Sequence, residues 1–95
     1  MLFEWNENKN KANQKKHGIS FEEAALIFKG EVLTHFDDNE DYGEEREMSI
    51  GLIGAHVVVV VVHTDRQNVT RIISARLANR SERKAYDDYY KKTTR

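Results

Sequence analysis

The sequence contains neither cysteine nor proline among its 95 residues. Without cysteine, the chain has no disulfide bonds and no thiolate ligands for a zinc site. No apolar run approaches the roughly 20 residues of a membrane-spanning helix, and the charged N-terminal segment lacks the apolar core of a signal peptide. A chain of this length can form one modest hydrophobic core. We therefore expect a single cytoplasmic domain over residues 1–95, with a frayed tail at 91–95.

Charge is distributed unevenly along the chain, although the net charge is only −1. Residues 1–62 hold 6 Lys and Arg against 12 Asp and Glu (net −6), whereas residues 63–95 hold 9 against 4 (net +5). A basic C-terminal third suits a polyanion such as RNA, because bound phosphates release counterions. An ordinary solvated surface is the alternative that charge alone leaves open.

The longest apolar run is six consecutive valines at residues 57–62. Valine is stiff at χ1 and fits the pleated surface of a strand. Since the run does not alternate with polar residues, both of its faces should be covered, as in the central strand of a sheet.

Two helices are expected before this strand. Asn6 is a suitable N-cap for the first, which Gly18 ends in a left-handed conformation. Ser20 and Glu23 form a capping box that opens the second, and Gly30 ends it. The predicted apolar stripe of this second helix consists of Phe21, Ala24, Ala25 and Phe28, widened by Leu26 and Ile27.

Strands are predicted at residues 31–36, 45–53 and 69–77 in addition to the valine run, and residues 2–5 form a brief strand or an extended arm. Gly54 and Ala55 make a tight hairpin turn. Asn79 and Glu82 cap a C-terminal helix. This order predicts an α+β fold, an antiparallel sheet of about four strands with two N-terminal helices and a C-terminal helix packed on it.

Arginines are concentrated after the valine strand, and Arg76 stands just before the start of a helix, where backbone amides favour anions. The planar guanidinium group is well suited to phosphate oxygens. The structural alternative is that these arginines form ion pairs with Glu45, Glu47 or Glu82.

Metal-free RNA cleavage needs a group to take the 2′-hydroxyl proton, cations to stabilise the phosphorane, and a proton for the leaving 5′-oxygen. Histidine suits proton transfer near neutral pH, and the chain has His17, His35, His56 and His63. Each alone is more typical of a surface or turn residue. No histidine pair and no acidic cluster has metal-ligand spacing, so a metal site is weakly supported.

The sequence resembles the BrnT family of toxins from bacterial type II toxin–antitoxin systems, which have a RelE-like fold. The resemblance runs from Phe3 to Tyr86. It rests on the segments Phe3-Glu-Trp-Asn-Glu-Asn-Lys9, Lys16-His-Gly18, Phe21-Glu-Glu-Ala24, Glu45-Arg46, Ile50-Gly51, Arg71-Ile-Ile-Ser-Ala-Arg76 and Glu82-Arg83, with Asn13 and Tyr86.

The resemblance implies a metal-independent endoribonuclease that inhibits translation and needs no cofactor. It also implies a BrnA-like antitoxin partner with a ribbon-helix-helix DNA-binding domain, in a dimer of heterodimers that reaches operator DNA only through the antitoxin. The acidic segment from Asp37 to Glu47 is expected to be a solvated loop; docking of a basic antitoxin segment there is the alternative.

Site residues follow from the positions that match the family. Arg71 and Arg76 are predicted to hold the phosphate and the transition-state charge, and Glu45 and His17 to transfer protons. The predicted RNA-binding cations are Lys9, Lys16, Arg46, Arg80 and Arg83. His63 stands where the family is expected to vary, which makes it a weaker candidate for catalysis.

Two positions depart from the expected pattern. Asn6 replaces an aspartate, which would change a helix cap and little else. Leu77 replaces a basic residue, which would weaken RNA binding without removing the site. Two other functions stay open: a toxin homologue that binds its antitoxin without catalysis, and an α+β domain whose arginines only pair with nearby carboxylates.

Overall fold

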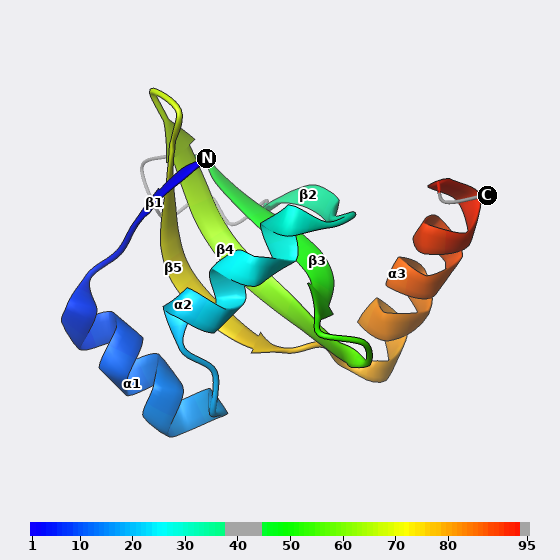
Figure 1. Ribbon diagram of the computed structural model, residues 1–95, viewed down its shortest axis with the longest axis horizontal. Coiled ribbons are helices and arrows are strands. Elements are labelled where there is room, and N and C mark those ends of the chain that lie inside the picture. Colours follow the sequence, from blue (N-terminus) through cyan, green and yellow to red (C-terminus); the bar gives the residue numbers. More distant parts are fainter. Residues whose placement is uncertain (38–44, 94–95) are drawn as a thin grey trace.

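The computed structural model describes residues 1–37 and 45–93, which form a five-stranded sheet with helices (Figure 1). The elements are β1 (Leu2–Glu4), α1 (Glu7–His17), α2 (Phe21–Ala24), the 3₁₀ helix η1 (Ala25–Lys29), β2 (Leu33–Asp37), β3 (Arg46–Ile53), β4 (Val57–Arg66), β5 (Val69–Leu77) and α3 (Arg80–Thr93). Of the acidic segment, residues 38–44 lie outside the described residues. The tail expected to fray is helical as far as Thr93, and residues 94–95 also lie outside. None of the described helices is long and apolar enough to cross a bilayer.

The strand order is β1-β5-β4-β3-β2, which confirms the valine strand as the central one. The predicted count of about four antiparallel strands is wrong, because β1 adds a fifth. It pairs in parallel with β5, from Leu2 opposite Val69 to Glu4 opposite Arg71, so the sheet is mixed. The sequence pattern of these three residues is too short to distinguish an edge strand from an extended arm.

The two faces of β4 belong to two apolar clusters. Val59 and Val61 pack with Phe21, Ile27 and other residues beneath α2 and η1. Val58 and Val60 pack with Tyr86 of α3 on the opposite face. Because both faces of β4 are covered, its valine run does not alternate with polar residues.

Helix α1 is almost entirely polar and docks through asparagine amides. Asn13 Nδ2 donates to the carbonyl oxygens of Ile19 (2.9 Å) and Ala75 (2.8 Å), and the Ala75 amide donates to Asn13 Oδ1 (3.1 Å). Because β1 covers β5 only at residues 69–71, the Asn13 side chain takes the place of a neighbouring strand at Ala75. Asn10 similarly accepts from the amide of Phe21.

The second predicted helix begins at its capping box, which is present, and then tightens from α into 3₁₀ geometry. Its buried residues are therefore Phe21, Ala24 and Ile27, spaced by three. The predicted α-helical stripe is wrong in detail, since Leu26 is 42% exposed. A 3₁₀ helix has three residues per turn, so its apolar face is a different set.

Candidate functional site

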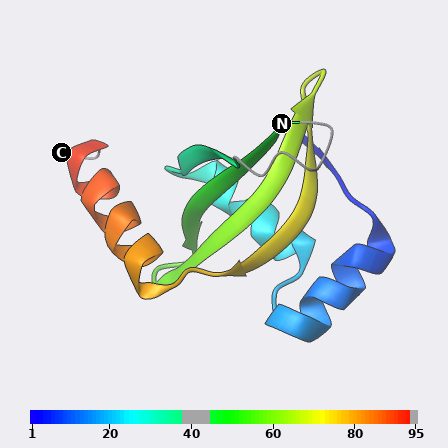
Figure 2. The ribbon, with the colours of Figure 1, turned by 180° about the vertical axis from the view of Figure 1, so that it is seen from behind.

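The two faces of the sheet differ in their cover. We call the face of Val59 and Val61, beneath α2 and η1, the covered face, and the face of Val58 and Val60 the open face. Among the described helices, only α3 packs on the open face, and it does so near one end of the strands. Figure 2 looks onto the open face, with β3, β4 and β5 in front of α2 and η1.

Arginines from neighbouring strands lie level with one another on the open face. Arg71 of β5 is opposite Thr64 of β4, and Glu47 of β3 is opposite His63, which places Arg46 level with Thr64. Successive side chains of a strand point to opposite faces. Arg46 therefore shares the face of Met48 and Ile50, and Thr64 that of Val60 and Val62. One row across the open face thus contains Arg46, Thr64 and Arg71.

Glu4 completes this row at the edge of the sheet. Arg71 Nη1 donates to Glu4 Oε2 at 2.6 Å, and both side chains are about half exposed. Arg71 has five N–H donors, of which this ion pair uses one. The other four N–H donors of Arg71 remain for a further acceptor.

Thr64, between the two arginines, is buried at 3% exposure. Its hydroxyl makes no hydrogen bond to any described residue. Buried hydroxyls are nearly always bonded, because an unmet one costs about 1–3 kcal/mol. The row therefore contains a polar group that lacks a partner within the described chain.

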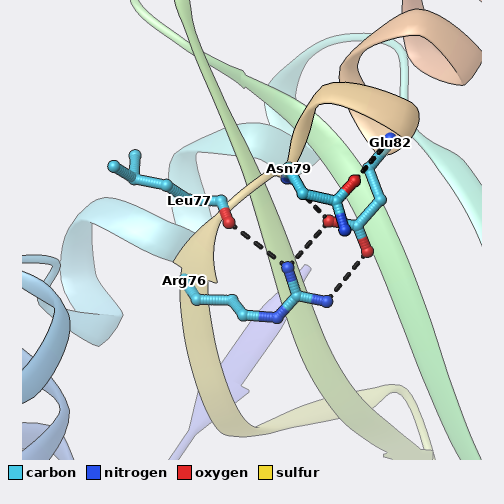
Figure 3. A network of polar contacts seen from close by, with 4 residues as sticks. All are labelled: Arg76, Leu77, Asn79 and Glu82. Carbon is cyan, nitrogen blue, oxygen red and sulfur yellow. Dashed lines mark hydrogen bonds and ion pairs between the residues drawn. The ribbon is translucent and has the colours of Figure 1, made fainter.

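Arg76 lies on the same face, opposite Val60, and is held by the first turn of α3 (Figure 3). Its Nη1 and Nη2 donate to the Glu82 carboxylate at 2.7 and 2.8 Å, and Nη1 also donates to the Leu77 carbonyl. Asn79 and Glu82 form the predicted capping box. For Arg76, the structural alternative, pairing with Glu82, is therefore present.

The Arg76–Glu82 pair shifts both groups away from their ordinary pKa values. The hydrogen bonds from Arg76 lower the pKa of Glu82, and those to Glu82 raise the pKa of Arg76. The Arg76 side chain remains 39% exposed. Three N–H bonds are in use, so Nε and one hydrogen of Nη2 remain for a further acceptor.

The other predicted site residues do not join this row. Lys9, Lys16 and His17 are on α1, which docks at the edge of β5 beside Ala75. Glu45 is exposed immediately before β3. Arg80 and Arg83 line a shallow groove along α3 with Lys84, Asp87, Asp88 and Lys91.

His63 is buried on the covered face, in a chain of hydrogen bonds across three strands. Its Nδ1 lies 3.1 Å from Asp65 Oδ1 and its Nε2 lies 2.8 Å from Ser49 Oγ, which lies 2.8 Å from Thr34 Oγ1. Because a carboxylate only accepts, the neutral imidazole donates from Nδ1 and accepts the serine proton at Nε2. Ser49 is fully buried and His63 is 2% exposed, so these two side chains join strands and have no access to a substrate.

The open face can therefore bind a polyanion through arginines that are fixed on adjacent strands. Among the described residues, no three His, Asp or Glu side chains are grouped as metal ligands. Thr64 and Glu4 were not predicted as site residues from the sequence. The alternation of side chains along each strand assigns these residues to one face. Which of them lie side by side can be predicted only when the register between strands is known.

Comparisons with known proteins agree with this fold. Residues 5–82 match the family described as "Ribonuclease toxin, BrnT, of type II toxin-antitoxin system". The chain also resembles the crystal structure of the Brucella abortus ribonuclease toxin BrnT, with a TM-score of 0.62 and 23% identity over 84% of this chain and 100% of that one. At this identity the likeness concerns the fold alone. No curated protein matches the sequence. The RelE-like character of the fold stays a prediction.

Proposed function

Since this chain belongs to the BrnT family of ribonuclease toxins of type II toxin–antitoxin systems, we propose that it is a metal-independent endoribonuclease whose substrate lies on the open face of the sheet. The observation that carries this proposal is the row of Arg46, Thr64 and Arg71 on adjacent strands, with Arg76 on the same face. Rigid strands hold such cations more precisely than loops do.

The arginines supply what phosphodiester cleavage requires in the transition state. Attack of the 2′-oxygen on phosphorus concentrates negative charge on the non-bridging oxygens, and fixed donors stabilise that charge most when they need no reorganisation. Arg46 and Arg71, which lie on either side of Thr64, together bind the scissile phosphate. Arg76, oriented by Glu82, contributes its remaining donors. Arg80 and Arg83, on α3, extend the cationic surface for the rest of the RNA.

Membership of a type II system implies an antitoxin partner. We propose that this partner is BrnA-like, with a ribbon-helix-helix domain, and that two toxin–antitoxin pairs form a heterotetramer bound to operator DNA through the antitoxin. RNA cleavage by the released toxin would stop translation. Support for this part comes from the family alone.

The experiment is cleavage of a defined RNA, without ribosomes and in excess EDTA, by the wild type and two variants. Arg71→Ala should reduce the cleavage rate by about 100-fold or more, the usual scale for one fixed oxyanion donor. Lys29→Ala, an exposed cation at the end of η1 on the covered side, should cleave like the wild type. Thermal melts confirm that both variants fold.

Equal cleavage by Arg71→Ala and wild type would remove Arg71 from the site. A wild type that cuts only with added divalent cation would overturn metal independence. If the wild type cuts no RNA but binds its antitoxin tightly, the chain is the non-catalytic partner that the sequence left open.

A further inference from the structure

His35 occupies a position that sequence patterns alone did not distinguish from the other three histidines. It lies in β2, opposite Met48 of β3, and is exposed. Leu33, two residues earlier, packs with Val60 and Tyr86 on the open face, as does Met48. Since alternate residues of a strand share a face, the His35 side chain lies on the open face with the arginines.

The strand register places His35 next to Arg46. Asp37, two residues after His35, is opposite Arg46, so His35 and Arg46 are diagonal neighbours on adjacent strands. Such neighbours are about 7–8 Å apart at their backbones, within reach of long side chains. One phosphodiester group can therefore contact the imidazole and a guanidinium at the same time.

The other histidines are excluded by their positions. His17 ends α1, which docks at the edge of β5, and His56 lies in the turn between β3 and β4. His63 is buried with Ser49 and Asp65. His35 is therefore the one histidine of the chain that is both exposed and on the face of the arginines.

We propose that His35 is the general base of RNA cleavage. This inference rests on the proposed function and names the residue that takes the 2′-hydroxyl proton. An imidazole nitrogen takes the 2′-hydroxyl proton as the 2′-oxygen forms its bond to phosphorus. The bond from phosphorus to the 5′-oxygen breaks, and that oxygen takes a proton from water. The products are a 2′,3′-cyclic phosphate and a 5′-hydroxyl, and the imidazolium returns its proton to solvent.

The charged and titratable groups around His35 come from several elements. The nearest are Asp37 on β2, Arg46 on β3, and Tyr89 of α3, which packs against the same apolar cluster as Leu33. The ion pairs Arg71–Glu4 and Arg76–Glu82 share this face but lie three or more strands away.

The test compares wild type, His35→Ala and His56→Ala on the same RNA in excess EDTA. His35→Ala should lose about 100-fold or more of the cleavage rate, the usual scale of general acid–base catalysis. Imidazole in the buffer should restore part of that rate, because the position is open to solvent. The acid-side fall of the wild-type pH profile should be absent from His35→Ala, and His56→Ala should match the wild type.

Two outcomes overturn the proposal, and they differ. If the wild type cleaves RNA and His35→Ala cleaves within about threefold of it, His35 is not the base although the ribonuclease function stands. If His35→Ala is slow but imidazole and pH leave its deficit unchanged, His35 has only a structural role. A wild type without any cleavage would overturn the proposed function and this inference together.

Discussion

At the scale of single residues, polar side chains on the covered side of the sheet position the N-terminal helices. Asn13 bonds to three backbone groups of Ile19 and Ala75, and Asn10 joins Phe21 to Glu7 and Glu22. An amide can satisfy both a donor and an acceptor of the backbone, which an apolar side chain cannot do. These two residues therefore replace the apolar stripe that α1 lacks.

Replacing Asn13 should show how much this docking contributes to stability. Asn13→Ala leaves buried backbone groups of Ala75 and Ile19 without partners, so the free energy of unfolding should fall by about 2–3 kcal/mol. Gln14→Ala removes an exposed amide from the same helix and should change stability by less than about 0.5 kcal/mol. Urea unfolding measures both. Equal stability of the two variants would show that α1 docks by other contacts.

Glu82 gives a prediction for pH. Its folded-state pKa is lowered by the hydrogen bonds from Arg76, and a carboxyl group of this kind stabilises the fold above its unfolded pKa. The contribution is lost as pH falls through the lower folded value, below the ordinary 4.5. Glu82→Gln should therefore be less stable than wild type by about 1 kcal/mol at pH 7, a value limited by the exposure of Arg76.

The same difference should shrink below pH 4.5 and vanish once Glu82 is protonated in the folded wild type. Thermal melts from pH 3 to pH 7 in steps of about one unit follow this change. Asp88→Asn, which breaks the exposed pair with Lys84, is the matched control and should change stability little at any pH. A Glu82→Gln deficit that persists unchanged in acid would show that the lost interaction is not the ion pair.

At the scale of elements, η1 approaches β3 where Gly51 has no side chain. A Cβ atom at Gly51 would lie 2.7 Å from Ile27 Cβ, closer than two such atoms can pack. Gly51→Ala should push η1 away and lower the free energy of unfolding by about 1–3 kcal/mol. Gly30→Ala, where a Cβ atom meets nothing within 4 Å, should be neutral or slightly stabilising. Urea unfolding would contradict the account if both variants kept wild-type stability.

Most elements could be predicted from sequence because their signals are local. Capping residues fixed the starts of α1, α2 and α3, and the valine run identified β4 as the central strand. The 3₁₀ geometry of η1 and the pairing of β1 could not be predicted, since both depend on tertiary contacts. Arg71 was recognised as a candidate from the sequence, but its row with Arg46 and Thr64 depends on the register of three strands.

At the scale of the whole molecule, the two faces of the sheet have different roles. The covered face holds the larger apolar cluster and the His63 hydrogen-bond chain, which together fix the fold. The open face has its apolar cluster at the α3 end and its arginines along the remainder. The proposed site is built on paired strands, which hold side chains more precisely than loops do.

The measurement that tests the central claim most directly is a map of the RNA-binding face by NMR. A short RNA with 2′-O-methyl groups, which lacks the attacking hydroxyl, is titrated into the ¹⁵N-labelled chain. The account predicts amide shift changes at Arg46, Thr64 and Arg71, and at His35, with little change at Asn13 and Ser49. Shifts concentrated on α1 and the covered face, with the open strands unmoved, would contradict it.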